Sequence, residues 1–260
     1  MNGVKTAFGR LFLWAGGDRL YRGWVNQRMG NPLRILCGHR VIDELAALSD
    51  DDRNDLRRGC LSLRSCGERM DYLKRRYRVF SLERALRNLR SRIRLPLNAV
   101  ILTFDDGFAD LYSALYPLMK ARRLPFTVFL TSGFIGDAGR LTEEQIRRMA
   151  ADREAEITWG AHGVSHKDLS IMSPGAAEKE ILESKHAVER LVGRPTEYFC
   201  YPDGKCSGEI KQILKQCGFV AACATGRRLN SGMIDLLELQ RIPFEEEPLW
   251  RFALRVAGRI

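Results

Sequence analysis

The sequence predicts an α/β fold in which parallel strands alternate with helices around a sheet or barrel. Short apolar runs alternate along the chain with longer segments whose apolar residues recur at helical spacing, which is the pattern of successive strand and helix units. Polar residues suited to chemistry directly follow several of these runs. The expected strands are residues 33–37, 99–104, 126–131, 156–161, 197–202, 219–224 and 238–243.

Residue types at the segment ends mark where three of the intervening helices begin and end. Ser81 precedes a segment of amphipathic pattern and Thr142 precedes two glutamates, and both are typical N-cap residues. A longer helix is expected to begin at Ser173, with Pro174 in its first turn and Gly193 as its end.

Length and composition indicate one domain with a well-filled core. The chain has 260 residues, of which 45% are hydrophobic, and a chain of this kind buries a large apolar core. It contains no internal repeat and no low-complexity linker. We therefore expect a main domain over residues 32–260, preceded by an N-terminal appendage over residues 1–31.

Charge and cysteine usage bear on partners and location. Lys and Arg outnumber Asp and Glu by 42 to 32, and the resulting net charge of +10 favours anionic partners such as phosphate or an acidic lipid surface. Seven cysteines without paired CxxC spacing argue against a disulfide framework and for a reducing compartment. The apolar patch at 11–16 is too short for a membrane span and lacks a following cleavage site. These features predict a cytoplasmic protein, with peripheral contact at the inner membrane face left open.

Two segments near the chain ends bear on that contact. Residues 6–28 and 248–260 both place aromatic side chains beside arginines. Such a segment either lies on an anionic membrane surface or packs on the domain as an amphipathic helix. The residues alone leave both interpretations open.

The residues that follow the expected strands gather at one edge. Asp105 and Asp106 follow the second strand, His162 follows the fourth, residues 202–204 follow the fifth and His39 follows the first. Because catalytic groups of parallel α/β proteins lie at the carboxyl ends of the strands, all of these would face one rim.

The adjacent carboxylates at that rim repel each other, so their position requires an explanation. One of them could cap a helix that begins near Phe108. Alternatively, a divalent cation removes the repulsion: His162 and His166, four residues apart, join one aspartate as ligands and leave the other carboxylate free as a base. Three ligands with open positions are typical of a catalytic site, here that of a hydrolase.

The motifs that carry this pattern resemble a known family. "TFDDG" at 103–107 and "HGVSH" at 162–166 are similar, in order and spacing, to the first two motifs of the polysaccharide deacetylases, the NodB-like domain of carbohydrate esterase family 4. The resemblance extends over about residues 33–245 and includes "YFCYPDG" and "LQRIPF". It implies a distorted (β/α) barrel of about seven strands, with residues 32–260 as the catalytic domain.

The resemblance also implies roles for matching residues. Asp105 would be the general base, and Asp106, His162 and His166 would bind one divalent metal ion. Histidine ligation favours Zn, while Co, Ni and Fe also accept this ligand set.

The third motif, "YPDG", places Tyr201, Pro202 and Asp203 beside the substrate. By the resemblance, the backbone N–H of Asp203 would stabilise the oxyanion of the reaction. The same four residues also form an ordinary turn, because Pro, Asp and Gly are strong turn formers. The two readings are compatible.

The sequence departs from the family at two positions. Many relatives hold the base with an arginine where this chain has Cys200, and Arg241 at the end of the last strand is our candidate replacement, although a surface arginine fits the sequence equally well. No histidine follows His186, so the proton donor found near the C-terminus of many relatives is missing. By elimination His39 is the candidate donor, with solvent water as the alternative.

These features predict a metal-dependent hydrolase that removes N-acetyl groups from an amino sugar in a glycan or in a lipid-linked or nucleotide-linked saccharide precursor. The alternative is a catalytically impaired carbohydrate-binding protein that retains the deacetylase fold. Nucleic acid is not an expected partner, because the arginine-rich segments contain no recognised binding module.

Overall fold

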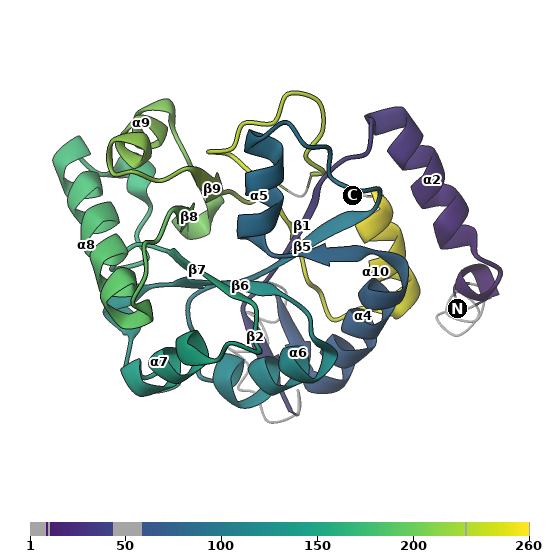
Figure 1. Ribbon diagram of the computed structural model, residues 1–260, viewed down its shortest axis with the longest axis horizontal. Helices are drawn as coiled ribbons and strands as arrows, with labels where there is room; N and C mark the ends of the chain where they lie inside the picture. The colour runs from purple at the N-terminus through teal and green to yellow at the C-terminus, as the bar shows by residue number, and fades with distance from the viewer. Residues whose placement is uncertain (1–8, 10, 44–58, 227, 260) are drawn as a thin grey trace.

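The computed structural model describes residues 9, 11–43, 59–226 and 228–259, and a parallel sheet lies at its centre (Figure 1). Seven strands form one path in the order β10-β1-β5-β6-β7-β8-β9, and β4 pairs with the first half of β5. The strands are β1 (Arg34–Gly38), β4 (Arg78–Phe80), β5 (Ala99–Phe104), β6 (Phe126–Leu130), β7 (Ile157–Ala161), β8 (Tyr198–Cys200), β9 (Ala221–Cys223) and β10 (Ile242–Pro243).

One segment, residues 236–243, connects the two edges of this sheet. At its start it runs beside β9, where the amide of Ala222 donates to the carbonyl of Leu236 and the amide of Leu239 donates to the carbonyl of Ala222, at 2.8 and 2.9 Å. At its end it becomes β10, in which Ile242 pairs with Leu36 of β1. The connection curls the sheet, and the predicted distorted barrel of about seven strands is confirmed.

Helices surround the strands on the outside (Figure 1). A smaller parallel pair, β2 (Arg40–Ile42) and β3 (Cys60–Ser62), lies beside the main sheet. The helices are α2 (Gly17–Met29), α4 (Leu63–Arg76), α5 (Leu82–Arg90), α6 (Tyr116–Arg122), α7 (Glu143–Ala151), α8 (Pro174–Val192), α9 (Gly208–Gln216) and α10 (Leu249–Ala257). Single turns occur at η3 (Leu111–Leu115), η4 (Ser132–Phe134), η5 (Leu169–Ile171) and η6 (Pro202–Gly204).

The helix boundaries predicted from cap residues are confirmed. The Ser81 hydroxyl accepts from the amide of Arg84, and Thr142 forms a reciprocal capping box with Gln145. Helix α8 begins with Pro174 and ends at Gly193, whose φ of 69° is the left-handed conformation that glycine adopts without strain.

The sequence missed three strands, and one predicted cap is wrong. Strands β2, β3 and β4 are three residues long, which is too short for a period to be visible. The helical segment after the carboxylate pair begins at Leu111 instead of Phe108, with Asp110 at its N-cap. Neither Asp105 nor Asp106 therefore caps a helix, and the helix-cap explanation of the pair is excluded.

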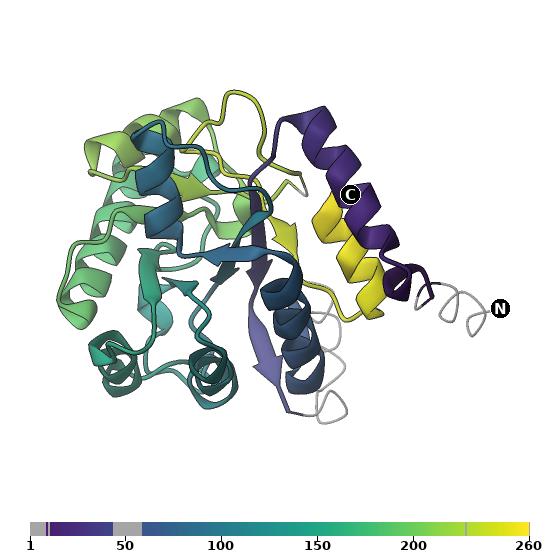
Figure 2. The same cartoon turned by 45° about the vertical axis from the view of Figure 1, so that its right-hand side comes forward.

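Both terminal helices pack on the domain, side by side (Figure 2). The inner face of α10 buries Phe252 and Val256 in the core, so the C-terminal segment is an ordinary amphipathic helix. On α2, buried Asp18 accepts a 2.8 Å hydrogen bond from the hydroxyl of Tyr72, and Asn26 accepts one of 2.7 Å from buried Arg34.

The N-terminal segment that includes α2 is in contact with the rest of the domain. A boundary between residues 31 and 32 stays a prediction, because α2 shares buried contacts with the main domain and residues 1–8 and 10 lie outside the described residues. Among the helices that the structure describes, none is both long and apolar enough to cross a bilayer.

Candidate metal centre and active site

The carboxyl ends of the central strands bring the predicted residues together. The amide of Asp105, directly after β5, donates to the carbonyl of Gly38 at the end of β1. The amide of His162, directly after β7, donates to the carbonyl of Leu130 at the end of β6. Because these bonds extend the sheet by one residue, the position of both side chains is set by strand register.

Three donor atoms from two loops converge on one point. The Oδ1 atom of Asp106 lies 3.4 Å from Nε2 of His162 and 3.3 Å from Nε2 of His166. Asp106 and His166 both have φ in the left-handed region, at 72° and 55°, where residues other than glycine are uncommon. The loops therefore adopt a costly backbone conformation that aims these side chains at each other.

The tautomer of His162 can be assigned from its buried partner. Its Nδ1 lies 2.7 Å from the carbonyl oxygen of Cys200, and a carbonyl only accepts, so Nδ1 carries the proton. With the proton fixed on Nδ1, Nε2 is the ring nitrogen that is available to bind a metal ion, and it points toward Asp106. Such a backbone partner on the second ring nitrogen is typical of metal-binding histidines.

These residues fit a small divalent cation. Asp106 Oδ1 is buried and has no hydrogen-bond partner among the described residues. Burial raises the pKa of Asp106, but the adjacent imidazoles, when they carry a proton on Nε2, outweigh it and hold that pKa well below its ordinary value, so the carboxylate is ionised and available to a cation that takes the place of those protons. Bonds of about 2.0 to 2.1 Å at tetrahedral angles separate neighbouring donors by about 3.3 to 3.4 Å, which is the spacing observed between Asp106 and each imidazole.

The neighbouring carboxylate is held by an arginine instead. Arg241 forms a bidentate pair with Asp105, with Nη1 to Oδ1 and Nη2 to Oδ2 both at 2.8 Å. Both side chains are almost completely buried. The guanidinium is fixed in turn by the carbonyl of Ala224 and the hydroxyl of Thr103, each at 3.1 Å. The structure thus places Arg241 where the sequence required an orienting group, and not at the surface.

This pair keeps Asp105 ionised. Burial raises the pKa of Asp105, but the charge and hydrogen bonds of Arg241, together with the nearby imidazoles, outweigh it and lower the pKa below its ordinary value. A buried carboxylate that is ionised, oriented and adjacent to a cation site has the properties of a general base.

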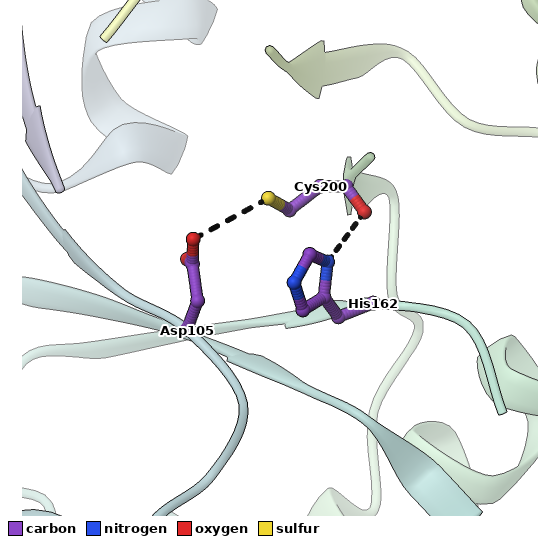
Figure 3. Close-up of side chains that lie close together, drawn as sticks. All are labelled: Asp105, His162 and Cys200. Carbon is purple, nitrogen blue, oxygen red and sulfur yellow. Dashed lines mark hydrogen bonds between the residues drawn. The ribbon is translucent and has the colours of Figure 1, made fainter. Parts of the chain in front are cut away.

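A second set of potential ligand atoms, on Asp105, His162 and Cys200, lies close by (Figure 3). Burial raises the pKa of the Cys200 thiol well above its ordinary value, so the sulfur keeps its proton, and it lies 3.6 Å from Oδ2 of Asp105. Arg241 donates to the same sulfur at 3.0 Å. Because Asp105 already pairs with Arg241, this set is a hydrogen-bonded network and does not fit a metal.

The candidate proton donor stands near the base but does not contact it. The Nε2 atom of His39 lies 3.9 Å from Oδ2 of Asp105, and its side chain is 28% exposed. His39 therefore reaches both solvent and the site, as a group that delivers a proton to a leaving amine must.

The third motif lies at the rim as predicted, but the side chain of one of its residues does not face the site. Pro202 and Asp203 form a single turn after β8, and Asp203 has a φ of 56°. Tyr201, in contrast, is completely buried, and its hydroxyl donates to the carbonyl of Leu237 at 2.8 Å. The side chain of Tyr201 is thus a core group that supports the turn and does not reach a substrate.

Most of the site residues lie within a range of the chain that is similar to known proteins. The model of the polysaccharide deacetylase family matches residues 93–222, a range that includes the carboxylate pair, both histidines and the third motif. The chain belongs to the polysaccharide deacetylase family. The resemblance expected from the sequence motifs is confirmed.

Individual relatives match this chain to different extents. YxkH of Bacillus subtilis, whose name classes it with the polysaccharide deacetylases, is 29% identical over 126 residues, which are 48% of this chain and 44% of that protein. A chitooligosaccharide deacetylase of Rhizobium leguminosarum is 30% identical over 92 residues, 35% of this chain and 38% of that one. The matches therefore span less than half the length of either relative.

A solved structure shares the fold over a larger range. The Streptococcus pyogenes deacetylase PplD, determined with acetate, superposes with a TM-score of 0.74 at 24% identity, covering 85% of this chain and 97% of that one. At this identity the superposition shows a shared fold and no more.

The sequence did not indicate one residue that shapes this candidate site. Glu180 of α8 accepts the amides of Val164 and Ser165 at 2.9 and 3.0 Å, and the Ser165 hydroxyl at 2.8 Å. Its carboxylate thus fixes the loop between His162 and His166 through these three hydrogen bonds. Nothing local marks Glu180, because it is one of several glutamates on an amphipathic helix, and only the packing of α8 against β7 brings it to the loop.

We expect Glu180→Gln to weaken metal binding by about 10- to 100-fold, the range known for residues that orient metal ligands. The neutral glutamine oxygen accepts from the two backbone amides less strongly than the carboxylate does, and its NH₂ group faces the Ser165 hydroxyl, so the clamp on the loop is weakened. A competition titration with a chromogenic zinc chelator measures the change. Glu183→Gln is the matched control, because Glu183 lies on the same helix but pairs with Lys179 at the surface. Equal zinc affinity of the two variants would show that Glu180 does not position the ligands.

Proposed function

We propose that this chain is a divalent-metal-dependent N-deacetylase that hydrolyses the acetamido group of an amino sugar. The observation that carries the proposal is the division of labour within the carboxylate pair. Asp106 faces two imidazoles and Asp105 is held ionised by Arg241. Two adjacent aspartates with different partners serve as one ligand and one base.

The ligands would be Asp106, His162 and His166, and Zn is the ion we favour, with Co, Ni or Fe as alternatives for the same donors. When bound, the ion would polarise the amide carbonyl and lower the pKa of water. The remaining steps belong to protein groups.

Asp105 is placed to take a proton from the attacking water while Arg241 keeps the carboxylate in one orientation. The water oxygen bonds to the carbonyl carbon, and the backbone N–H of Asp203 is our candidate donor to the resulting oxyanion. Cleavage of the C–N bond then requires a proton on the departing nitrogen, for which His39 is positioned. The products are acetate and a free amino sugar.

The substrate class we propose is a phosphate-bearing saccharide precursor, linked to a nucleotide or a lipid. Next to the site, the Arg140 guanidinium lies 3.8 Å from the centre of the Phe108 ring and 4.8 Å from that of Phe134. It donates to the backbone carbonyl of Asp106 at 3.3 Å. An arginine held between two rings beside the reaction centre suits a diphosphate, and the name of the Rhizobium relative supports an N-acetylated saccharide.

An acetate-release assay on metal-loaded protein tests the proposal. The substrates are N-acetylated chito-oligosaccharides and a nucleotide-linked N-acetylhexosamine, assayed before chelation, after chelation and after zinc is restored. We expect release that is lost with the metal and regained with it. Saccharide binding without acetate release by loaded protein would instead support the carbohydrate-binding alternative.

We expect His39→Ala to lower kcat by about 10² to 10⁴, the range of an acid or base group, with metal content unchanged. Metal content is measured on the same preparation by atomic absorption. Loss of metal together with activity would assign His39 a structural role, and an unchanged kcat would mean that water protonates the leaving amine.

A further inference from the structure

Exposed apolar side chains of this protein are concentrated on one surface. Of the eight large apolar side chains that are exposed in the described part of the chain, six lie on two neighbouring segments, residues 11–24 and the loop that joins α5 to β5. Trp14 is 85% exposed, Leu20 78% and Leu97 64%. The six residues are Leu11, Trp14, Leu20, Trp24, Ile93 and Leu97.

Helix α2 has two chemically different faces. Asp18, Arg22 and Val25 point inward and are buried, which follows the helical spacing of three and four residues. Leu20 and Trp24, four residues apart, lie on the outer face. A helix on the surface of a soluble protein normally has polar residues on its outer face, so two large apolar side chains at this position are unusual.

The loop after α5 is tied to the same surface. Asn26 on α2 donates to the side chain of Asn98 at 2.8 Å, and Asn31 just beyond α2 donates to the carbonyl of Leu95 at 3.1 Å. These bonds hold the loop with Ile93 and Leu97 beside α2, so the six apolar side chains form one region.

The exposed charged side chains within residues 11–31 and 84–98 are all arginines. They include Arg19 and Arg28 on α2 and Arg92 and Arg94 on the loop, and Arg28 lies over the Trp24 ring at 5.6 Å. Residues 11–31 and 84–98 contain a single acidic side chain, Asp18, which is buried. Tryptophan and leucine interleaved with arginine match the boundary of an anionic bilayer, where rings lie among headgroups and arginines reach phosphates.

We propose that this surface, the six apolar residues with Arg19, Arg28, Arg92 and Arg94, docks the protein on an anionic lipid bilayer. The partner is a bilayer and not a protein groove, because α2 lies at the periphery of the molecule as a convex rod (Figure 2). Binding is peripheral, and the helix lies parallel to the membrane plane.

The docked orientation follows from the strand that separates the surface from the site. The loop with Ile93 and Leu97 leads into the amino end of β5, whereas Asp105 follows its carboxyl end. Six residues of strand span about 20 Å. The catalytic rim therefore lies about one strand length from the docked loop, and the bilayer does not cover it. Docking itself requires neither metal nor substrate and stands independently of the proposed function.

Vesicle binding tests the proposal with the whole protein. We expect co-sedimentation with vesicles that contain phosphatidylglycerol, little with vesicles of phosphatidylcholine alone, and weaker binding as salt increases. Tryptophan fluorescence should shift to shorter wavelength on binding. Equal binding to both vesicle types, or none to either, would overturn the proposal.

Variants locate the contact. The double variant Arg92→Glu and Arg94→Glu should lose about 25-fold or more in partitioning, at about five-fold for each arginine, and Trp24→Ser with Leu97→Ser should abolish the fluorescence shift. Ile171→Ser is the control, because Ile171 is more exposed than Trp24 or Leu97 but follows β7 at the catalytic end. All of the substituted residues are exposed, and circular dichroism checks that each variant is folded. If the same variants leave vesicle binding intact, or instead dissociate a lipid-free dimer, the surface serves another partner.

Discussion

Asp105→Asn is expected to lower the rate of acetate release by about 10² to 10⁴ while metal content stays unchanged. The amide cannot accept a proton from water at neutral pH. Its shape is retained, however, and its oxygen still accepts from one arm of Arg241. The metal ligands are on other side chains, so their geometry is preserved.

Two further variants show whether the loss is chemical. Asp106→Asn should empty the metal site, since its Oδ1 faces both imidazoles. Asp137→Asn, at an exposed aspartate, should leave both activity and metal content unchanged. Atomic absorption and initial rates on the three proteins separate the two roles. If Asp105→Asn lost metal, or retained turnover, Asp105 would not be the base.

Arg241→Met is expected to destabilise the fold by about 3 to 5 kcal/mol, the usual cost of leaving one partner of a buried ion pair unpaired. Asp105 would then lie almost completely buried without its bidentate partner. Urea denaturation with and without the substitution measures the difference. Arg251→Met is the control, because Arg251 is exposed on α10.

The double variant Asp105→Asn with Arg241→Met completes the cycle. Removing both charges also removes the unpaired ion, so part of the lost stability should return relative to Arg241→Met alone. Arg241→Lys keeps one charge but cannot form two parallel hydrogen bonds, and we expect its kcat to fall with metal content intact. Full activity of Arg241→Lys would limit Arg241 to a structural role.

Local sequence pattern predicted most of the scaffold. The boundaries of six apolar runs lie within two residues of the observed strands, and the last run overlaps the short β10 at its end. Cap residues placed α5, α7 and α8 because capping depends only on neighbours in the chain. The rim residues followed from the same information, since strand ends are visible as the point where an apolar run stops.

The amino-acid sequence by itself determined the positions of seven strands along the chain, the starts of α5, α7 and α8, and most of the rim residues, because each depends on neighbours along the chain. Only the tertiary structure decided which groups meet across long separations. Arg241 reaches Asp105, 136 positions away, because residues 236–243 close the sheet, and α8 brings Glu180 under the histidine loop. It also decided what the terminal helices expose: α10 buries its apolar face in the core, whereas α2 leaves Leu20 and Trp24 exposed. Such pairings depend on packing and register, which no local period encodes.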